Sequence, residues 1–305
     1  MNRLRIATRA STLAVAQTQI VVEALKKHGP NAGFEIVEIK SKGDIDRKKP
    51  LWELSETGFF TTAVEDALRE NKADIAVHSY KDLPIEGSAG LVASAVLDRR
   101  FCQDCLVCRQ KTKSLNDLPK GARIGTSSLR RKAQLLHARP DLVCEPIRGN
   151  VPTRISQVEK GLFDGTVLAY AGVERLGLTK KISFCFSPAE FIPAPAQGAI
   201  AVQAGADNDE ILKLLAEIDD KVSRITSDAE RLVLHKIGAG CHAPAGVFAQ
   251  IADGDIMIYA FVSDENGREF INREKQGPVK SAQKIAENLA DELLKAGAGE
   301  LLKNE

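Results

Sequence analysis

Short apolar runs bounded by turn residues alternate with segments of helical periodicity over the first two-thirds of the chain, and this alternation restricts the possible folds. The pattern is typical of βα units with mainly parallel sheets. It predicts strands at residues 4–8, 34–39, 74–78, 91–96, 122–126, 142–145 and 166–169. It predicts helices at residues 11–27, 60–70, 128–138, 151–160 and 208–219.

The same region contains a faint duplication. Residues 6–14, IATRASTLA, and residues 124–133, IGTSSLRRKA, both have the pattern of a strand, a hydroxyl-rich turn and a helix. DIAVHSYKDLP, from Asp74, and DGTVLAYAGVERL, from Asp164, form a second pair. We therefore expect two related α/β domains with two helix N-termini at the cleft between them, where free N–H groups attract anions.

After about Val222 the pattern changes to a helix, three alternating strands and a last helix, at residues 223–235, 246–251, 255–263, 268–275 and 281–295. This predicts a small α+β domain. We predict the following division of the chain: residues 1–97 plus 196–218, residues 98–195, and residues 219–305.

Composition limits the class of protein. Of the 305 residues, 44% are hydrophobic and 27% are charged, which are values typical of a globular chain. The N-terminus lacks the apolar core of a signal peptide, and no segment has the roughly 18 apolar residues of a membrane span, so we expect a cytoplasmic protein. Six irregularly spaced cysteines without a secretion signal favour free thiols over disulfides.

The net charge of +1 conceals local groups of arginines in SSLRRK, PIRGNVPTR and GVERLG. A nucleic-acid surface usually shows a large basic excess, often with aromatic residues for stacking, and only 5% of this chain is aromatic. A compact anionic ligand fits local arginines in a nearly neutral protein better than a nucleic acid does.

Two turns offer hydroxyl and guanidinium groups at the start of a helix. In the first turn, Ser11 is either an ordinary N-cap or a ligand-binding group. Arg9 lies near the positive end of the helix, where a cation is unfavourable unless an anion binds there. The second turn repeats this arrangement with residues Thr126, Ser127, Ser128, Arg130 and Arg131.

The strand in DIAVHSYKDLP ends in polar residues. Ligands bind at the carboxyl ends of strands in open α/β sheets. Lys81 and Asp82 are therefore either a surface ion pair or a site in which Asp82 faces a cationic or N–H-donating ligand and Lys81 faces a carboxylate. His78 is more consistent with a structural than a catalytic role.

Further guanidinium groups follow other predicted strands, at Arg148, Arg154 and Arg175. A single arginine would normally be a solvated charge or part of a surface pair. Several directed at one cleft would suit a ligand with many carboxylates, since each charged hydrogen bond contributes about 1.5–3 kcal/mol.

Cys102, Cys105 and Cys108 form C-x₂-C-x₂-C, which is part of an iron–sulfur ligand pattern, but Thr112 stands where the fourth cysteine would be required. If residues 105–108 form a strand, Cys102 and Cys108 face one side and Cys105 the other. We favour small buried thiols over a cluster and expect no metal site.

Cys241 and His242 are adjacent in GAGCHAPAG. Neighbours on an extended chain point in opposite directions, so a thiol–imidazole dyad is disfavoured, and no further Cys or His lies at a metal-ligand spacing. The cysteine either fills a turn or lies on a loop where a bulky group can approach its sulfur.

Taken in order, TRASTLAVAQT, SKGD, DIAVHSYKDLP, GTSSLRR, RGNVPTR, LAYAGVERLGL, AQGAIAV and GAGCHAPAG resemble the porphobilinogen deaminase (hydroxymethylbilane synthase) family over nearly the whole chain. The resemblance implies two α/β domains like those of type II periplasmic binding proteins, each with a mixed, mainly parallel sheet, plus a small C-terminal α+β domain. It implies the joining of four porphobilinogen units with loss of ammonia on a dipyrromethane primer, followed by hydrolytic release of hydroxymethylbilane.

The resemblance also implies residue roles. Cys241 would hold the dipyrromethane cofactor through a thioether, and Asp82 would stabilise the cationic azafulvene that forms as ammonia leaves. The implied cofactor-binding residues are Lys81, Thr126, Ser128, Arg130 and Arg131. The implied substrate-binding residues are Arg9, Ser11, Phe60, Arg148, Arg154 and Arg175. The resemblance further implies a monomer that makes a transient contact with the next enzyme of the pathway.

The chain departs from the family pattern at Thr57 and Thr62, which replace two lysines, and at Ala196–Gln197–Gly198, where the family has G-Q-G. Gln203 and Gly205 replace a later acidic and basic pair.

Two other functions remain as alternatives. A non-catalytic anion-binding protein would explain the arginines but not Asp82 or Cys241. An iron–sulfur protein would explain only the three spaced thiols.

Overall fold

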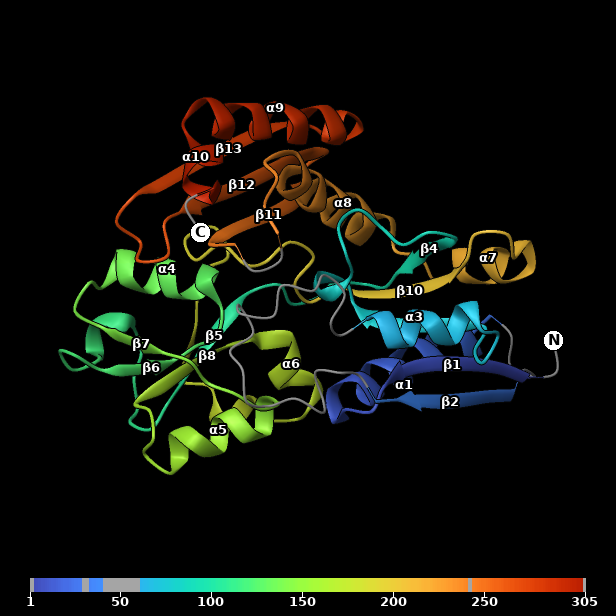
Figure 1. The fold of residues 1–305 in the computed structure, drawn as a ribbon, viewed down its shortest axis with the longest axis horizontal. Coiled ribbons are helices and arrows are strands. Elements are labelled where there is room, and N and C mark those ends of the chain that lie inside the picture. The colour runs from blue at the N-terminus through green and yellow to red at the C-terminus, as the bar shows by residue number, and fades with distance from the viewer. Residues whose placement is uncertain (1–2, 29–32, 41–60, 241–242, 304–305) are drawn as a thin grey trace. The chain divides into compact units, whose positions relative to one another are not determined.

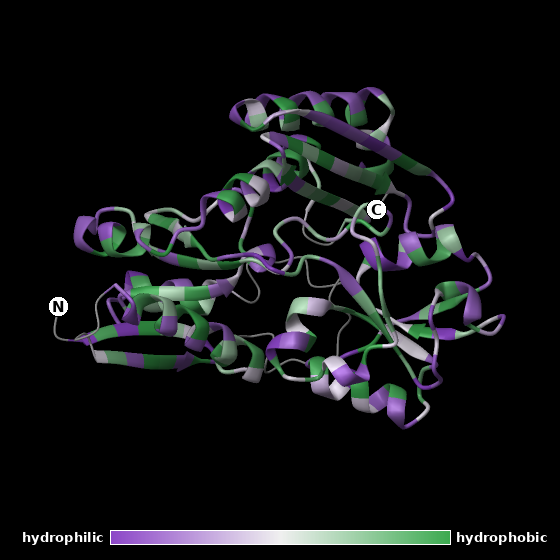
Figure 2. Ribbon diagram, turned by 180° about the vertical axis from the view of Figure 1, so that it is seen from behind, coloured by the Kyte–Doolittle hydropathy of each residue, from purple (hydrophilic) through white to green (hydrophobic). Residues whose placement is uncertain are grey.

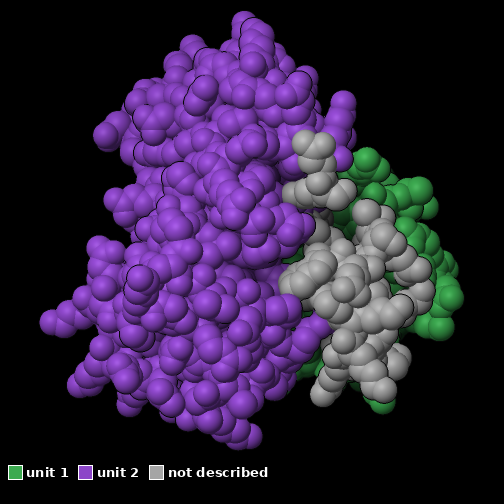
Figure 3. Space-filling model, turned by 60° about the vertical axis from the view of Figure 1, so that its left-hand side comes forward, with its two compact units in different colours: residues 1–49, 54–100, 198–224 green, residues 50–53, 101–197, 225–305 purple. Residues whose placement is uncertain are grey.

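The computed structural model describes the chain except residues 1–2, 29–32, 41–60, 241–242 and 304–305 (Figure 1). Contacts divide it into two compact units (Figure 3). Unit 1 comprises residues 1–49, 54–100 and 198–224, and unit 2 comprises residues 50–53, 101–197 and 225–305. The division into three domains made from the sequence stays a prediction.

Unit 1 is built on a five-stranded mixed sheet. Its strand order is β2 (Gly33–Ile39), β1 (Arg3–Arg9), β3 (Ile75–Ser79), β10 (Ile200–Gly205), β4 (Leu91–Val96). β1 is parallel to both β2 and β3, whereas β10 is antiparallel to β3 and β4. The strand β10, which the sequence patterns did not predict, enters the sheet long after the first four strands in the chain.

Alternation along the strands of unit 1 places apolar side chains on both faces of its sheet. Leu4 and Ile6 of β1 pack with α1 (Thr12–Lys26) and α7 (Asp209–Ala216) on one face. Ala7 packs with Val64 and Leu68 of α3 (Thr62–Arg69) on the other face. The sheet is therefore covered by helices on both sides, as expected for a sheet with buried parallel strands.

Unit 2 contains an equivalent sheet. Its strand order is β7 (Val143–Glu145), β6 (Arg123–Gly125), β8 (Gly165–Ala169), β5 (Asp104–Cys108), β9 (Phe184–Cys185). β6 is parallel to β7 and β8, whereas β5 is antiparallel to β8 and β9. The accompanying helices are α4 (Leu129–Ala138), α5 (Val151–Glu159) and α6 (Tyr170–Arg175).

The two sheets have the same order of parallel and antiparallel strands, so the predicted duplication and the mixed α/β sheets are confirmed. β1 corresponds to β6 and β3 to β8, as the two pairs of matching segments indicated. The patterns missed β5, β9, β10 and α6. β5 is a short strand that begins with an aspartate and contains two cysteines, β9 has two residues, and α6 follows β8 without a break.

The last part of the chain forms the predicted small α+β arrangement, a three-stranded antiparallel sheet in the order β11 (Ala245–Ala252), β12 (Asp255–Ser263), β13 (Phe270–Pro278). Helix α9 (Ala282–Lys295) packs on β12 and β13 (Figure 1), and the other helices here are α8 (Lys221–Lys236) and α10 (Ala298–Lys303). β11 and β12 are largely apolar, whereas β13 is largely hydrophilic and exposed (Figure 2).

Candidate active site

A pocket in unit 1 lies at the carboxyl ends of β1 and β3. These strands are parallel neighbours, with Ile6 opposite Ile75, so the segments that follow them meet at one edge of the sheet. The pocket is lined by Arg9, Ser11, Leu13, Ala14, Gln17, Thr61, Val77, His78, Ser79 and Asp82. Three of the predicted site residues, Arg9, Ser11 and Asp82, are thus brought together.

The first turn of α1 forms one wall of this pocket. Ser11 is the N-cap, and its Oγ accepts a hydrogen bond of 3.2 Å from the N–H of Ala14, which confirms the N-cap interpretation. Gln17, in the second turn of α1, donates a hydrogen bond from Nε2 to Oγ of Ser79 at 2.9 Å. This hydrogen bond connects α1 to the end of β3. It therefore fixes the distance between the first turns of α1 and the segment after β3, which line the pocket on two sides.

His78 of β3 is buried beside this pocket. Burial lowers the pKa of His78 to about 4; the Gln203 side chain opposes the shift and the positive charge of Arg9 adds to it. The imidazole is therefore neutral at neutral pH. Gln203 itself is buried and donates from Nε2 to Oε1 of Glu65 at 3.0 Å, so the replacement of the family's acidic residue is accommodated inside the unit.

Asp82 ends a short 3₁₀ turn, Tyr80–Asp82, that follows β3 directly. The turn leaves the Asp82 carboxylate half-buried and on the lining of the pocket. Lys81 precedes it on the same turn but does not line the pocket. Of the two adjacent charges, the structure places only the carboxylate at this pocket.

In unit 2 the corresponding turn joins β6 to α4. Ser128 is the N-cap of α4 and accepts a hydrogen bond from the N–H of Arg131 at 3.4 Å. Thr126 is buried, and its Oγ1 accepts a hydrogen bond from the N–H of Ser128 at 3.2 Å. Ser127 donates from Oγ to the carbonyl of Ile147 at 2.6 Å, which fixes the turn to the segment after β7.

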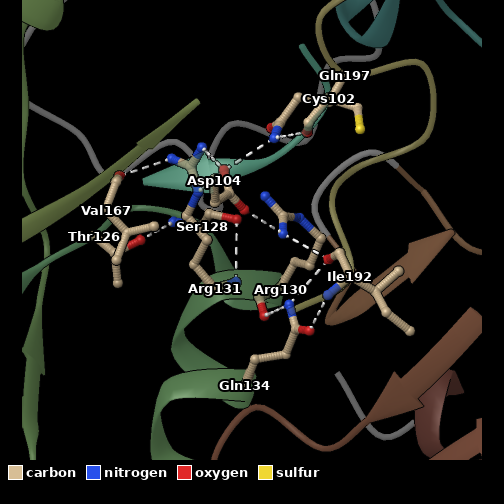
Figure 4. Close-up of polar contacts among 10 residues, drawn as sticks. All are labelled: Cys102, Asp104, Thr126, Ser128, Arg130, Arg131, Gln134, Val167, Ile192 and Gln197. Atoms are coloured by element: carbon tan, nitrogen blue, oxygen red, sulfur yellow. Dashed lines mark hydrogen bonds and ion pairs between the residues drawn. The ribbon is translucent and has the colours of Figure 1, made fainter. Parts of the chain in front are cut away.

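Arg130 and Arg131 extend from the first turn of α4 to Asp104 of β5 (Figure 4). Nη1 of Arg130 lies 2.8 Å from Oδ2 of Asp104, and Nη2 of Arg131 lies 2.7 Å from Oδ1. The side chains of Arg130 and Arg131 are only 5% and 8% exposed, and that of Asp104 is fully buried. The paired arginines therefore form part of a buried ionic network.

Arg148 and Arg154 lie at the start of α5. Nε of Arg154 donates to the carbonyl of Gly149 at 2.8 Å, and burial together with the charges of Arg131 and Arg148 lowers the pKa of Arg154 to about 10. Among the residues that the structure describes, Nε and Nη2 of Arg148 are buried and make no hydrogen bond. The predicted guanidinium groups of these segments are close enough to repel one another.

Arg175 is the last residue of α6, and burial lowers its pKa while Glu174 opposes the shift. Two predicted site residues, Cys241 and Phe60, lie outside the described residues, as does Thr57. Thr62 is the first residue of α3.

The spaced cysteines pack in separate places. Cys105 packs in an apolar cluster with Ile155 on one face of the sheet, whereas Cys108 packs against Leu106 on the other. Cys102 contacts a third cluster around Ile192 and Phe261. The three thiols thus pack in separate apolar clusters. Cys105 is buried, Cys102 and Cys108 are half-buried, and the five cysteines that the structure describes are free thiols.

Four polar residues of these sites were given no site role from the sequence: Gln17, Ser79, Asp104 and Gln197. Gln17, Ser79 and Gln197 lie within motifs that were recognised, and Asp104 lies between two of the spaced cysteines, but the partner of each is distant along the chain. Gln17 and Ser79 are 62 residues apart, and Gln197 donates to Asp104 over 93 residues. Only a contact prediction could have found them.

Comparison with known proteins assigns the chain to a family. Residues 4–213 match the family described as porphobilinogen deaminase, dipyromethane cofactor binding domain, and residues 224–295 match porphobilinogen deaminase, C-terminal domain. The chain belongs to the porphobilinogen deaminase family. It is therefore a transferase of tetrapyrrole biosynthesis, a hydroxymethylbilane synthase that acts on porphobilinogen and carries a dipyrromethane cofactor.

Two relatives in the porphobilinogen deaminase family extend along most of the chain. A probable porphobilinogen deaminase of Methanopyrus kandleri is 43% identical over 266 residues, which cover 87% of this chain and 89% of the relative. The porphobilinogen deaminase of Desulforudis audaxviator is 40% identical over 297 residues, covering 97% and 96%.

Solved structures of binding proteins show a distant likeness. The methionine-binding protein MetQ is 12% identical with a TM-score of 0.45, covering 73% of this chain and 92% of that one. A TRAP periplasmic solute-binding protein of Pseudomonas putida F1 is 11% identical with a TM-score of 0.42, covering 76% and 80%. No helix within the described residues has the length and apolar character to cross a membrane.

The residues of unit 2 fit the cofactor of the porphobilinogen deaminase family, whose pyrrole rings bear acetate and propionate groups. Asp104 carries one negative charge against the two positive charges of Arg130 and Arg131, and Arg148 has buried N–H groups that find no acceptor among the described residues. Donors and positive charge in excess are what a polycarboxylate group requires.

Proposed function

We propose that the chain joins four porphobilinogen molecules head to tail, with loss of one ammonia from each, and releases hydroxymethylbilane by hydrolysis. The observation that supports this mechanism best is the pocket of unit 1, where one carboxylate, Asp82, shares a lining with Arg9 and Ser11. Such a pocket offers both a partner for positive charge and donors for carboxylates.

Asp82 is the catalytic residue in this proposal. The C–N bond of the substrate's protonated aminomethyl group breaks, nitrogen keeps the electron pair and leaves as ammonia, and the positive charge spreads over the remaining methylene-pyrrole and its ring nitrogen. A carboxylate accepts a hydrogen bond from the ring N–H and stabilises the positive charge where it develops. The 3₁₀ turn holds Asp82 in place, so little reorganisation is required.

Arg9, Ser11, Arg148, Arg154 and Arg175 bind the carboxylates of the substrate and of the growing chain. Thr126, Ser128, Arg130 and Arg131, together with Lys81, hold the acetates and propionates of the cofactor. When bound, the dipyrromethane group supplies the nucleophilic pyrrole carbon from which the chain grows. Cys241 anchors that group through a thioether, and the aromatic ring of Phe60 packs near the incoming pyrrole.

The test combines activity with intact mass. Purified protein incubated with porphobilinogen should yield uroporphyrin after oxidation, and its mass should include the cofactor. Cys241→Ser should carry no covalent pyrrole adduct and should lose turnover, whereas Cys185→Ser, which alters an exposed thiol, should behave like the unmodified chain. A normal rate with Cys241→Ser would refute the anchoring role, and binding without release of ammonia would favour a non-catalytic anion-binding protein.

We further propose that the enzyme acts in the cytoplasm as a monomer and contacts the next enzyme of the pathway only transiently. The support is the family resemblance alone. Light scattering of the purified protein at several concentrations tests the oligomeric state, since a mass near twice 33.0 kDa would contradict it.

A further inference from the structure

Asp104 is the centre of the buried network in unit 2 and no role has so far been given to it (Figure 4). Its Oδ1 accepts hydrogen bonds from Nε and Nη2 of Arg131 at 3.2 and 2.7 Å and from Nε2 of Gln197 at 2.9 Å. Its Oδ2 accepts one hydrogen bond, from Nη1 of Arg130 at 2.8 Å. The two oxygens are therefore used unequally.

Burial would raise the pKa of Asp104, but the charges and hydrogen bonds of Arg130 and Arg131 outweigh it and hold that pKa well below its usual range. The group is an anion between two cations, so the three side chains together carry a net positive charge. An excess charge in a buried place is unfavourable until a counter-ion binds.

Of the three nitrogens of the Arg130 guanidinium, Nη1 donates hydrogen bonds to protein acceptors. Nη1 donates to Asp104 and, at 2.8 Å, to the carbonyl of Ile192, while the Nε2 of Gln134 donates to the same carbonyl at 3.0 Å. Within the described residues, Nε and Nη2 of Arg130 make no hydrogen bond. The protein thus holds one nitrogen of this guanidinium and leaves the other two.

We propose that Asp104 is a positioning residue for the cofactor: by binding Nη1 of Arg130 it fixes the guanidinium so that Nε and Nη2 remain for a carboxylate of the dipyrromethane group. This inference rests on the proposed cofactor-binding function of Arg130. Asp104 would then contribute to the affinity for the cofactor without contacting it.

Asp104→Asn tests this role selectively. Asparagine has one acceptor oxygen, and the position of Oδ1 receives three donors whereas that of Oδ2 receives one. The amide oxygen should therefore take the place of Oδ1 and keep the hydrogen bonds from Arg131 and Gln197. The NH₂ group should then face Nη1 of Arg130, and because both groups are donors, no hydrogen bond forms between them. The substitution should remove one of the two acceptors of Nη1 of Arg130, so that the carbonyl of Ile192 alone no longer fixes the guanidinium, and should leave Arg131 held.

The experiment measures cofactor loading as well as activity. Chains produced without porphobilinogen are incubated with graded porphobilinogen, and the loaded fraction is read from intact mass. Losing one charged hydrogen bond should raise the half-loading concentration for Asp104→Asn about tenfold. Asp141→Asn is the matched control, because Asp141 forms a separate ion pair with Arg139 in the same unit, and it should load normally. Circular dichroism and urea unfolding check that each unloaded chain is folded.

A double-mutant cycle separates positioning from general destabilisation. If Asp104 acts through Arg130, then Asp104→Asn combined with Arg130→Met should load within about twofold of Arg130→Met alone. Additive losses, or normal loading of Asp104→Asn, would overturn the inference. Should Asp104→Asn not fold, the comparison of the double variant with Arg130→Met decides in the same way. Normal loading of Arg130→Met would instead refute the proposed function of Arg130.

Discussion

At the scale of single residues, two aspartates of this enzyme have opposite surroundings. Asp82 lies on a 3₁₀ turn at the lining of a pocket, whereas Asp104 is fully buried and enclosed by guanidinium groups. A carboxylate with open surroundings can respond to charge that develops on a substrate. One that is already paired with two arginines can only hold them in place.

Asp82→Asn should abolish most turnover. The amide keeps the shape of the side chain but not the charge that stabilises the cationic methylene-pyrrole, so kcat should fall by about 10²–10³ while KM changes little. Steady-state assays with porphobilinogen measure both constants. Glu86→Gln, at an exposed position just beyond the same turn, is the control, and a near-normal kcat for Asp82→Asn would remove it from the catalytic role.

His78 predicts a pH dependence of stability. Its pKa is about 4 in the folded chain against 6.5 in the unfolded one, so between these values the unfolded state alone binds the proton. The contribution of His78 is therefore complete above about pH 6.5, is lost as the pH falls toward 4, and changes no further below that. The shift corresponds to about 3–4 kcal/mol as an upper bound.

Urea unfolding of the unmodified chain and of His78→Gln at pH 7 and about pH 4.5 measures this contribution. The loss of stability on acidification should be smaller in the variant, because glutamine does not titrate. His28→Gln, at an exposed histidine, should retain the full pH dependence. Parallel losses in the unmodified chain and His78→Gln would contradict the predicted titration.

At the scale of elements, most of the candidate site residues lie at or near the N-termini of helices. Ser11 begins α1, Ser128 begins α4 and Asn150 begins α5, and in each case the cap side chain accepts a hydrogen bond from the helix backbone. The cap fixes where the first turn lies, and the first turns of α4 and α5 place their arginines. Local sequence thus controls charge placement through the helix N-terminus.

Gly149→Ala should disturb the start of α5. Gly149 has φ of +106°, and an added Cβ would lie 2.6 Å from Cγ2 of Thr153. Gly177, with φ of +69° and open space around it, is the matched control. Both variants should lose about 1 kcal/mol of unfolding free energy, because alanine is strained at a positive φ. Gly149→Ala should lose about 1–3 kcal/mol more, because its Cβ would collide with Thr153. Urea unfolding of both variants measures the difference, and equal losses would show that α5 adapts freely.

At the scale of the whole molecule, a net charge of +1 coexists with a local group of arginines in unit 2, of which Arg130 and Arg131 are buried and Arg148 and Arg154 are half-buried. Arg131 and Arg148 both lower the pKa of Arg154, and within the described part of the chain one buried carboxylate, Asp104, compensates Arg130 and Arg131. The folded chain without its cofactor therefore holds unbalanced like charges, and the loaded chain should be more stable.

Salt should distinguish the two forms. Raising sodium chloride from about 20 mM to about 0.5 M screens repulsion, so it should raise the thermal midpoint of unloaded Cys241→Ser more than that of the loaded chain. Cys185→Ser, which retains the attachment cysteine, should follow the loaded chain. Thermal unfolding at both salt concentrations checks this, and equal shifts would mean that the arginine charges are already compensated by solvent.

The sequence by itself determined what depends on neighbouring residues. The positions of most strands and helices follow from local periodicity, and the motifs around Asp82, Arg130 and Arg148 identify the family because they are contiguous. The helix cap at Ser11 was equally readable. These features need no knowledge of the rest of the chain.

Only the tertiary structure decided which of these residues meet. β10 completes the first sheet although it follows every strand of the second, and Asp104 reaches Arg130 over 26 residues and Gln197 over 93. Such contacts are fixed by strand order and by the requirement that buried charges find partners, not by local pattern. For that reason the arginines were predictable from the chain, whereas the carboxylate that holds them was not.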